Sequence, residues 1–359
     1  MIYRYLDAYT QSALGAGHIG MNLKELSEVL GLSPTTVSRA LNGYPEVSAA
    51  TRSRVIAAAQ KHGYVPNSVA KRLATGRAMA IGHVVPLGEH DMINPIFADF
   101  LAGAGETYSS AGYNMLLRVV PRDDEAQAYR AMAAAQSVDG VVVHGPTVSD
   151  TRLALLQELG LKFIVHGRTA TEEPYSWLDI NNRRAFQRAT DYLVGLGHTR
   201  IALINGLEAM RFAHQRRKGY EAALEAAGIA PDPALMFQAD MTEPYGYHTT
   251  RALLRRGEPP TAFLASSLIT ALGVGRAIAE AGMVMGREVS VITHDDAMSF
   301  LPNYGTVPMF TATTSSVRAA GKRTAEMLLD MIEGRVEEPQ TELWECDLVL
   351  GASTGPAPT

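Results

Sequence analysis

The chain has 359 residues, of which 47% are hydrophobic and 19% are charged, as in globular proteins that fold around buried cores. Its single cysteine, Cys346, excludes an intramolecular disulfide and a cysteine-rich zinc site, which suits a reducing cytoplasm. No apolar run has the length of a membrane-spanning helix and no signal-peptide pattern is present, so we expect a cytoplasmic protein with no membrane partner.

Positive charge is concentrated near the N-terminus. Residues 21–77 carry eight Lys and Arg residues and three Glu residues, whereas the whole chain has a formal net charge of −5. A small basic module joined to an acidic body is typical of a protein that binds nucleic acid through one domain.

The segment that follows Met21 has the pattern of three short helices. Apolar residues at helical spacing start the first at Leu23, and Gly31 ends it. Pro34 fits the first position of a second helix that runs to about Leu41, and Ser48 caps a third. The apolar residues expected to face a shared core are Leu23, Leu26, Val29, Leu30, Val55, Ile56 and Ala59.

From Ala80 onward, apolar β-type runs alternate with amphipathic stretches of helical length. The expected strands are Ala80–Val85, Met115–Val120, Gly140–Val143, Phe163–Val165, Ile201–Ile204, Ala262–Leu264 and Val289–Ile292. Such alternation predicts parallel sheets with helices on both faces. Because the segment exceeds 270 residues, two α/β lobes fit better than one.

The second predicted helix carries residue types that read DNA. Short Thr side chains contact thymine methyl groups, and Arg reaches guanine, when a helix enters the major groove. The candidate base-reading residues are Pro34, Thr35, Thr36, Ser38 and Arg39.

The stretch Leu32–Asn42, with Val47-Ser48, Thr51-Arg52 and the segment Gly63–Ala74, resembles the DNA-binding headpiece and hinge of the LacI/GalR family of transcriptional regulators. The resemblance implies a short hinge helix that folds only on DNA, because nine residues are too few for a stable isolated helix. It also implies a leucine that unstacks a base step in the minor groove. The hinge residues assigned to DNA on this basis are Asn67, Ala70, Lys71, Arg72 and Leu73.

The resemblance continues through Asn94–Phe97, Gly219-Tyr220 and Asp295-Asp296 and implies a two-lobed core like the periplasmic sugar-binding proteins, with a ligand between the lobes. Carboxylates and Arg hydrogen-bond paired hydroxyls, and aromatic rings stack on a pyranose. The candidate effector-binding residues are Asp91, Phe97, His144, Arg168, Trp177, Arg216, Ser267 and Asp295. The chain departs from the family pattern at Ile180–Asn182 and at Ser267-Leu268.

The predicted fold is α+β and multidomain: a three-helix helix-turn-helix headpiece, a hinge helix, and a two-lobed α/β core of the type I periplasmic-binding-protein kind. The expected boundaries are 1–20 for a disordered extension or an upstream-start artefact, 21–66 for the headpiece, 67–77 for the hinge helix and linker, and 78–359 for the core. One lobe should combine about 78–181 with 315–334, and the other 182–314 with 335–359.

We therefore expect a homodimer, with a tetramer left open, that binds a near-palindromic operator and represses genes of carbohydrate uptake or catabolism. The expected effector is a sugar that acts as an inducer, with an α-glucoside or another disaccharide favoured. The alternative is a corepressor-type regulator that responds to a non-sugar metabolite such as a nucleobase. No cofactor or catalytic activity is expected, because the Gly273-Val-Gly275 stretch starts like a dinucleotide fingerprint but lies inside a helical run instead of after a strand. No metal is expected, because the ten histidines are scattered along the chain.

Overall fold

The computed structural model describes residues 21–41, 44–64, 76–87, 95–303 and 305–358. The chain forms two compact units, Met1–Arg77 and Ala78–Thr359. The expected extension 1–20, the hinge positions 67–75 and the candidate effector residue Asp91 lie outside the described residues. Among the helices that are described, none is long and apolar enough to cross a membrane.

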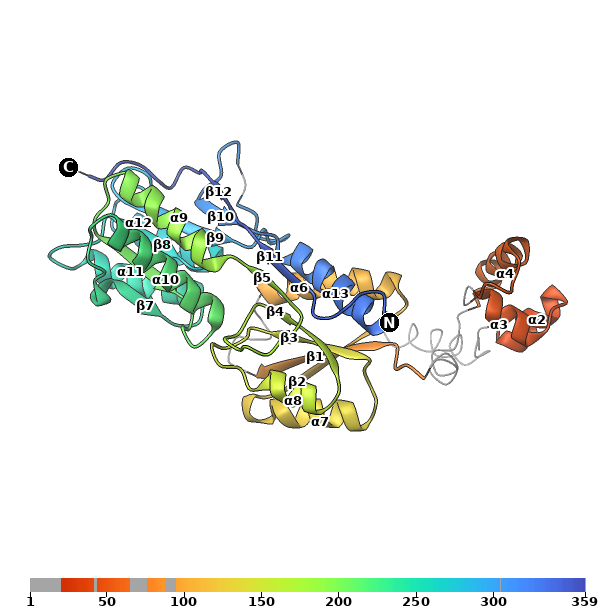
Figure 1. Cartoon of the computed structure of the whole chain (residues 1–359). Coiled ribbons are helices and arrows are strands. Elements are labelled where there is room, and N and C mark those ends of the chain that lie inside the picture. Colours follow the sequence, from red (N-terminus) through yellow and green to blue (C-terminus); the bar gives the residue numbers. More distant parts are fainter. Residues whose placement is uncertain (1–20, 42–43, 65–75, 88–94, 304, 359) are drawn as a thin grey trace, which may run out of the picture. The chain divides into compact units, whose positions relative to one another are not determined.

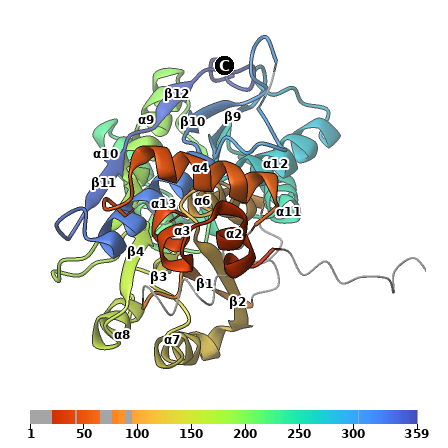
Figure 2. The same ribbon diagram turned by 90° about the vertical axis from the view of Figure 1, so that its right-hand side faces the viewer.

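The first unit contains the three helices that the sequence predicts: α2 (Leu23–Leu30), α3 (Pro34–Leu41) and α4 (Ala49–Lys61). Asn22 and Glu25 form a capping box at the start of α2, and Gly31 ends that helix with a φ of 63°. Ser48 caps α4 by accepting a hydrogen bond from the Thr51 amide at 3.3 Å. Figure 2 shows α4 lying across α2 and α3.

The core of this unit is narrower than the sequence suggests. Leu26, Val37 and Val55 are fully buried where the three helices meet. Two residues that we expected in the core are on the surface instead: Val29 is 55% exposed and Ile56 is 41% exposed. Three short helices bury only a thin stripe of each surface, so residues at the flanks of the apolar face stay in solvent.

The second unit contains two six-stranded sheets. The first sheet has the order β11-β5-β4-β3-β1-β2, and all its neighbours are parallel. Its strands are β1 (Ala80–Leu87), β2 (Asn114–Pro121), β3 (Gly140–His144), β4 (Lys162–His166), β5 (Trp177–Ile180) and β11 (Thr341–Trp344). The second sheet has the order β12-β10-β9-β8-β6-β7, with only the β10–β12 pair antiparallel. Its strands are β6 (Ile201–Asn205), β7 (Met236–Gln238), β8 (Ala262–Ala265), β9 (Ser290–Asp295), β10 (Thr311–Thr314) and β12 (Asp347–Val349).

Helices cover both faces of each sheet, so every sheet and its helices form one lobe (Figure 1). The helices of the first lobe are α6 (Pro95–Ser110), α7 (Glu125–Ala134), α8 (Arg152–Glu158) and α13 (Val317–Glu333). Those of the second are α9 (Asn182–Gly195), α10 (Arg211–Ala226), α11 (Glu243–Leu254) and α12 (Leu268–Glu280). The short 3₁₀ helices η1 (Arg122–Asp124) and η2 (Pro233–Leu235) lie in the connections. The predicted two-lobed α/β core is thereby confirmed.

The chain passes between the lobes three times: after β5, after β10 and after β11. The last crossing differs from the expected boundary at residue 335. Thr341 pairs with Trp177, so β11 belongs to the first sheet and only the residues after it return to the second lobe. Three strands that join the lobes, β5, β10 and β11, have only four residues each.

Candidate functional site

Helix α3 presents one polar face to solvent. Pro34, Thr35 and Arg39 are exposed, while Val37 and Ala40 on the opposite side are buried against α2 and α4. Thr36 and Ser38 are half-buried at the margins of this face. The first two turns of α3 therefore offer the residue types that contact base edges from a helix in the major groove.

Hydrogen bonds fix the turn that precedes α3 and the helices around it. The Ser33 hydroxyl accepts from the Thr36 amide at 3.1 Å, and the two hydroxyl oxygens lie 2.8 Å apart. Arg54 donates to the Leu30 carbonyl at 2.6 Å, so it ties α4 to the end of α2. The Thr36 hydroxyl is thus committed to the helix cap in the free protein, which leaves Thr35 as the more available threonine.

The hinge assignments Asn67, Ala70, Lys71, Arg72 and Leu73 lie outside the described residues, and their DNA contacts stay predictions.

A cavity of about 700 Å³ lies between the two lobes of the second unit. Its walls come from the carboxyl ends of strands in both sheets, which is where ligands bind in open parallel sheets. Four of the sequence candidates line it: Phe97, His144, Arg168 and Arg216. Among the described residues, no group of three or more His, Cys, Asp or Glu side chains could hold a metal ion.

Aromatic rings and histidines form the wall on the first lobe. His144 and His166, at the ends of β3 and β4, pack against Phe100 with ring centroids at 4.9 and 4.5 Å. Phe97 meets the His144 ring edge-on at 4.9 Å. His83 lies behind them, with its Nδ1 atom 2.9 Å from His144 Nε2. This wall gives a ligand an apolar surface with few polar groups.

Burial keeps these three histidines neutral. It lowers the pKa of His83 to about 3 and that of His166 to about 4. Burial also lowers the pKa of His144 well below its usual value, and the neighbouring His83, His166 and Arg152 add to the effect. The histidine wall therefore brings no positive charge to the cavity at neutral pH.

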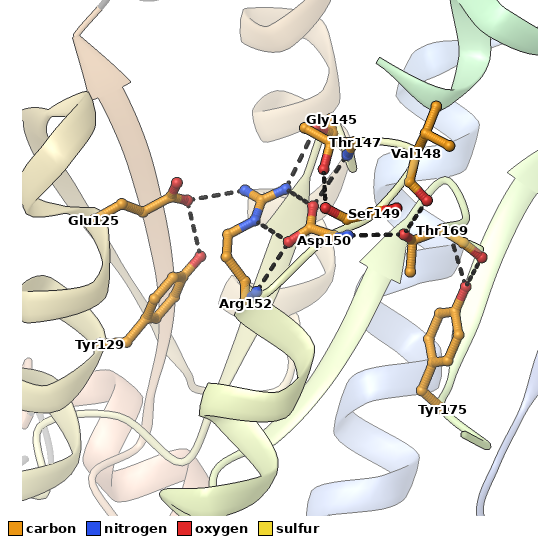
Figure 3. Close-up of polar contacts among 10 residues, drawn as sticks. All are labelled: Glu125, Tyr129, Gly145, Thr147, Val148, Ser149, Asp150, Arg152, Thr169 and Tyr175. Carbon is orange, nitrogen blue, oxygen red and sulfur yellow. Dashed lines mark hydrogen bonds and ion pairs between the residues drawn. The ribbon is translucent and has the colours of Figure 1, made fainter. Parts of the chain in front are cut away.

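A charged network holds the loop between β3 and α8 (Figure 3). Arg152 donates to both carboxylate oxygens of Asp150, at 2.9 and 2.6 Å, and to Glu125 at 2.9 Å. Asp150 also accepts from the Thr147 amide at 3.0 Å, and its own amide donates to the Thr169 hydroxyl at 3.1 Å. Hydrogen bonds and the charge of Arg152 lower the pKa of Asp150 despite its burial. This bidentate, charge-assisted arrangement makes a rigid polar corner of the cavity.

Arg168 and Asp179 form a second pair in the wall, with Arg168 Nε donating to Asp179 at 2.7 Å. The Arg168 guanidinium lies 4.7 Å from the centre of the Trp177 ring. Trp177 does not line the cavity. Its ring packs against the Arg168 guanidinium and not, as expected from the sequence, against a sugar ring.

Arg216 dominates the wall on the second lobe. The close approach of α9 and α10 at Gly219, where a Cβ would lie 2.0 Å from the Arg183 carbonyl oxygen, brings this buried side chain near the start of α9. Arg216 donates to the Asn182 side chain at 2.7 Å and to the Ser266 carbonyl. Burial lowers the pKa of Arg216 to about 10, so the group remains charged at neutral pH.

Two predicted residues of this lobe are displaced by one position from the residues that line the cavity. Asp296 lines it, whereas Asp295 accepts a hydrogen bond from the Ala297 amide at 2.8 Å. Ser266 lines it, whereas the Ser267 hydroxyl caps α12 by accepting from the Thr270 amide at 3.2 Å. Burial raises the pKa of Asp296 to about 7, against the opposing effect of Arg216.

Sequence reasoning missed several polar residues of the cavity: Glu125, Asp150, Arg152, Asp179, Asn182 and Asp296. Most of them follow the carboxyl end of a strand or begin a helix. A systematic search of those positions would have found them.

Comparisons with known proteins agree with this architecture. Residues 22–67 match the family model of bacterial regulatory proteins, lacI family, and residues 190–354 match that of a periplasmic binding protein-like domain. The chain is 44% identical to the HTH-type transcriptional regulator AglR of Rhizobium meliloti (strain 1021), over 94% of this chain and 95% of the relative. It is 30% identical to the HTH-type transcriptional regulator RafR of Escherichia coli, over 90% of this chain and 96% of the relative.

Two solved structures are similar along nearly the whole chain. A transcriptional regulator CelR–cellobiose complex is 29% identical, with a TM-score of 0.69 over 93% of this chain and 99% of that one. The lac repressor dimer bound to operator and the anti-inducer ONPF is 25% identical, with a TM-score of 0.74 over the same shares.

Proposed function

This chain belongs to the lacI family of bacterial regulatory proteins and is a DNA-binding regulator of transcription, and from that premise we propose that a sugar in the 700 Å³ cavity controls its hold on operator DNA. The genes it represses would serve carbohydrate uptake or catabolism. The role is regulatory and not catalytic, and it is exercised in the cytoplasm.

The cavity is the observation that carries this proposal. Its volume of about 700 Å³ lies in the upper half of the range of about 300 to 1,000 Å³ that is typical of small-molecule sites. A cavity of this size has room for more than one pyranose ring. Phe97 and the histidine wall offer an apolar face, while Arg168, Asn182 and Asp296 offer hydrogen-bonding groups. A ring with one apolar face and a rim of hydroxyls matches this mixture.

The lobes touch at two places that a change in their relative angle would break. At the cavity rim, the Arg211 amide donates to the Pro146 carbonyl at 2.9 Å and the Val148 amide to the Ala209 carbonyl at 3.0 Å. Farther away, Ser299 of the second lobe donates twice to Asp99 of α6, at 3.0 and 2.8 Å. A ligand that contacts both lobes favours one arrangement by its differential affinity, worth about 1–3 kcal/mol or 5- to 150-fold in DNA affinity.

On DNA we propose a homodimer that binds a near-palindromic site. One α3 helix of eight residues buries too little surface for operator affinity, and a two-fold dimer supplies a second half-site. The similar lac repressor structure is a dimer bound to operator, which supports this assembly. Pro34, Thr35 and Arg39 would read bases, with Thr36 and Ser38 at the edge of the contact.

We favour a disaccharide, such as an α-glucoside, as an inducer. The similar CelR protein was solved with cellobiose, which supports an effector of this size. Selection of an operator in vitro, followed by fluorescence anisotropy of that operator with the full-length protein and a panel of disaccharides, tests the proposal. We expect at least one neutral disaccharide to weaken operator binding by 5- to 150-fold. Tighter binding in the presence of a nucleobase, with no response to any sugar, would contradict it.

A further inference from the structure

The arginines of the cavity are already engaged by groups of the protein itself. Arg152 directs all three of its nitrogen atoms to Asp150, Glu125 or the Gly145 carbonyl. Arg216 donates to Asn182 and Ser266, and Arg168 donates through Nε to Asp179. An anionic ligand would have to displace these partners to pair with Arg152, whose three nitrogen atoms are all engaged.

Acidic side chains outnumber arginines in the described part of the wall by six to three, although Asp296 is only partly ionised at neutral pH because burial raises its pKa to about 7. Among the lining residues that the structure describes, three are arginines and six are carboxylates: Glu125, Asp150, Asp179, Asp240, Glu243 and Asp296. One of these, Glu243, pairs at 2.8 Å with Arg276, which lies outside the wall. The histidines add no compensating charge because burial keeps His144 and His166 neutral.

Helix N-termini attract anions, and several helices begin at this cavity. At three of these ends one free amide is bound by a side chain of the protein itself, whereas the α10 end at Met210 has no side-chain cap. The α8 terminus is capped by Asp150, which accepts from the Arg152 amide at 3.0 Å. Thr242 accepts from the Tyr245 amide at the start of α11, and Ser267 does so for α12. At these three ends, part of the set of amides that would attract a phosphate is therefore already satisfied.

We infer that the cavity takes an uncharged sugar and rejects phosphorylated or otherwise anionic sugars, an inference that rests on the proposed function. Phosphate carries nearly two negative charges at neutral pH and would enter a partly desolvated site with an excess of negative charge. At separations of about 7 Å and an effective dielectric constant of about 20, one such repulsion weakens binding by about 50-fold.

Isothermal titration calorimetry of the full-length protein with matched pairs of ligands tests this inference. The pairs are sucrose with sucrose 6-phosphate, and trehalose with trehalose 6-phosphate. For the pair whose neutral member binds, we expect the phosphate ester to bind at least about 50-fold more weakly. A phosphate ester that binds as tightly as its neutral parent would overturn the inference and leave the sugar-responsive function standing. If titrations with maltose, cellobiose and melibiose as well as these four ligands show no binding, the proposed effector class itself is wrong.

Charge variants test the cause. Asp179→Asn and Asp240→Asn each remove one negative charge from the wall while keeping the side-chain size. Removal of one such repulsion should reduce the discrimination against the phosphate ester by up to about 50-fold, and by less for the exposed Asp240, whose charge is screened by solvent. Asp240 is exposed, so Asp240→Asn should not change the stability of the folded protein. The matched control is Glu258→Gln. The Glu258 side chain is 84% exposed and lies on the second lobe outside the cavity wall. Equal discrimination in all three variants would show that wall charge is not the selective feature.

Discussion

The stability of the first lobe should fall steeply between pH 6.5 and pH 5. His83, His144 and His166 are buried as neutral rings, and their pKa values in the folded chain lie far below the value of about 6.5 in an unfolded chain. As the pH falls through 6.5, the unfolded chain takes up protons that the folded chain does not. The stabilisation is therefore fully present above about pH 7.5 and is lost as the solution becomes acidic.

The magnitude follows from the number of protons. Each buried neutral histidine contributes a slope of up to about 1.4 kcal/mol per pH unit, so three contribute about 4 kcal/mol per unit. Asp179 acts in the opposite sense, because burial raises its pKa and favours the protonated, folded form at low pH. A net slope of about 3 kcal/mol per unit would remove about 4 kcal/mol by pH 5, a large part of the 5–15 kcal/mol typical of a folded domain.

The two tryptophans make the measurement specific. Trp177 and Trp344 both lie in the first sheet, on β5 and β11, and the chain contains no others. Urea unfolding followed by tryptophan fluorescence at pH 5, 6, 7 and 8 therefore reports on this lobe. His166→Gln should reduce the slope by about 1.4 kcal/mol per unit, whereas His248→Gln, at an exposed position on α11, should not change it. A slope below about 1 kcal/mol per unit in the unmodified protein would refute the reasoning.

Three predictions concern DNA and effector. Arg39→Ala should relax base preference at one operator position by about 1–3 kcal/mol. Lys24, an exposed lysine in the first turn of α2, is expected to contact phosphate, so Lys24→Ala should weaken binding to all sequences alike and reduce the slope of log affinity against log salt by about one; binding-site selection with anisotropy titrations separates the two outcomes. Leu73→Ala should leave non-specific binding intact and reduce both operator preference and DNA bending, as measured by gel mobility of permuted sites; an unchanged bend would contradict the assignment. Asp296→Asn should abolish the response to the inducing sugar and leave operator affinity near normal, whereas Asp295→Asn should keep the response. The reverse result would show that Asp295, the residue predicted from the sequence, contacts the effector.

The sequence predicted those parts of the fold that local chemistry determines. Helix starts and stops were correct where a cap residue marks them, as at Gly31 and Ser48. Strands with a continuous apolar run, such as β1 and β8, were also correct. Five strands were missed, β5, β7, β10, β11 and β12, and each has only three or four residues. In β10 and β11, the Thr, Glu and Trp side chains do not form an apolar run. Such strands form because the sheet beside them supplies partners, which no local pattern records.

The site was predicted to within one residue where a strand or turn sets the direction of a side chain. Asp295 and Asp296 are both acidic, and Ser266 and Ser267 are both serines, so composition does not distinguish the members of either pair. Both pairs lie where a strand ends, β9 at Asp295 and β8 at Ala265, and the backbone direction of the residues that follow is set by the turn and not by a local pattern. Arg152 and Glu125 were missed for a different reason: 27 residues separate them in the chain, and only the fold brings them to 2.9 Å.

An uncharged effector has a consequence for the DNA equilibrium. A neutral sugar adds no charge to the complex, so the proposed function predicts that it alters operator binding by changing the fraction of molecules whose lobes are arranged for DNA. The number of phosphates contacted by each bound molecule then stays the same, and that number sets the slope of log affinity against log salt. Operator titrations at several salt concentrations, with and without the inducing sugar, should therefore give parallel lines displaced by about 1–3 kcal/mol. A slope that decreases by two or more with the sugar present would show instead that the effector removes phosphate contacts from the bound complex.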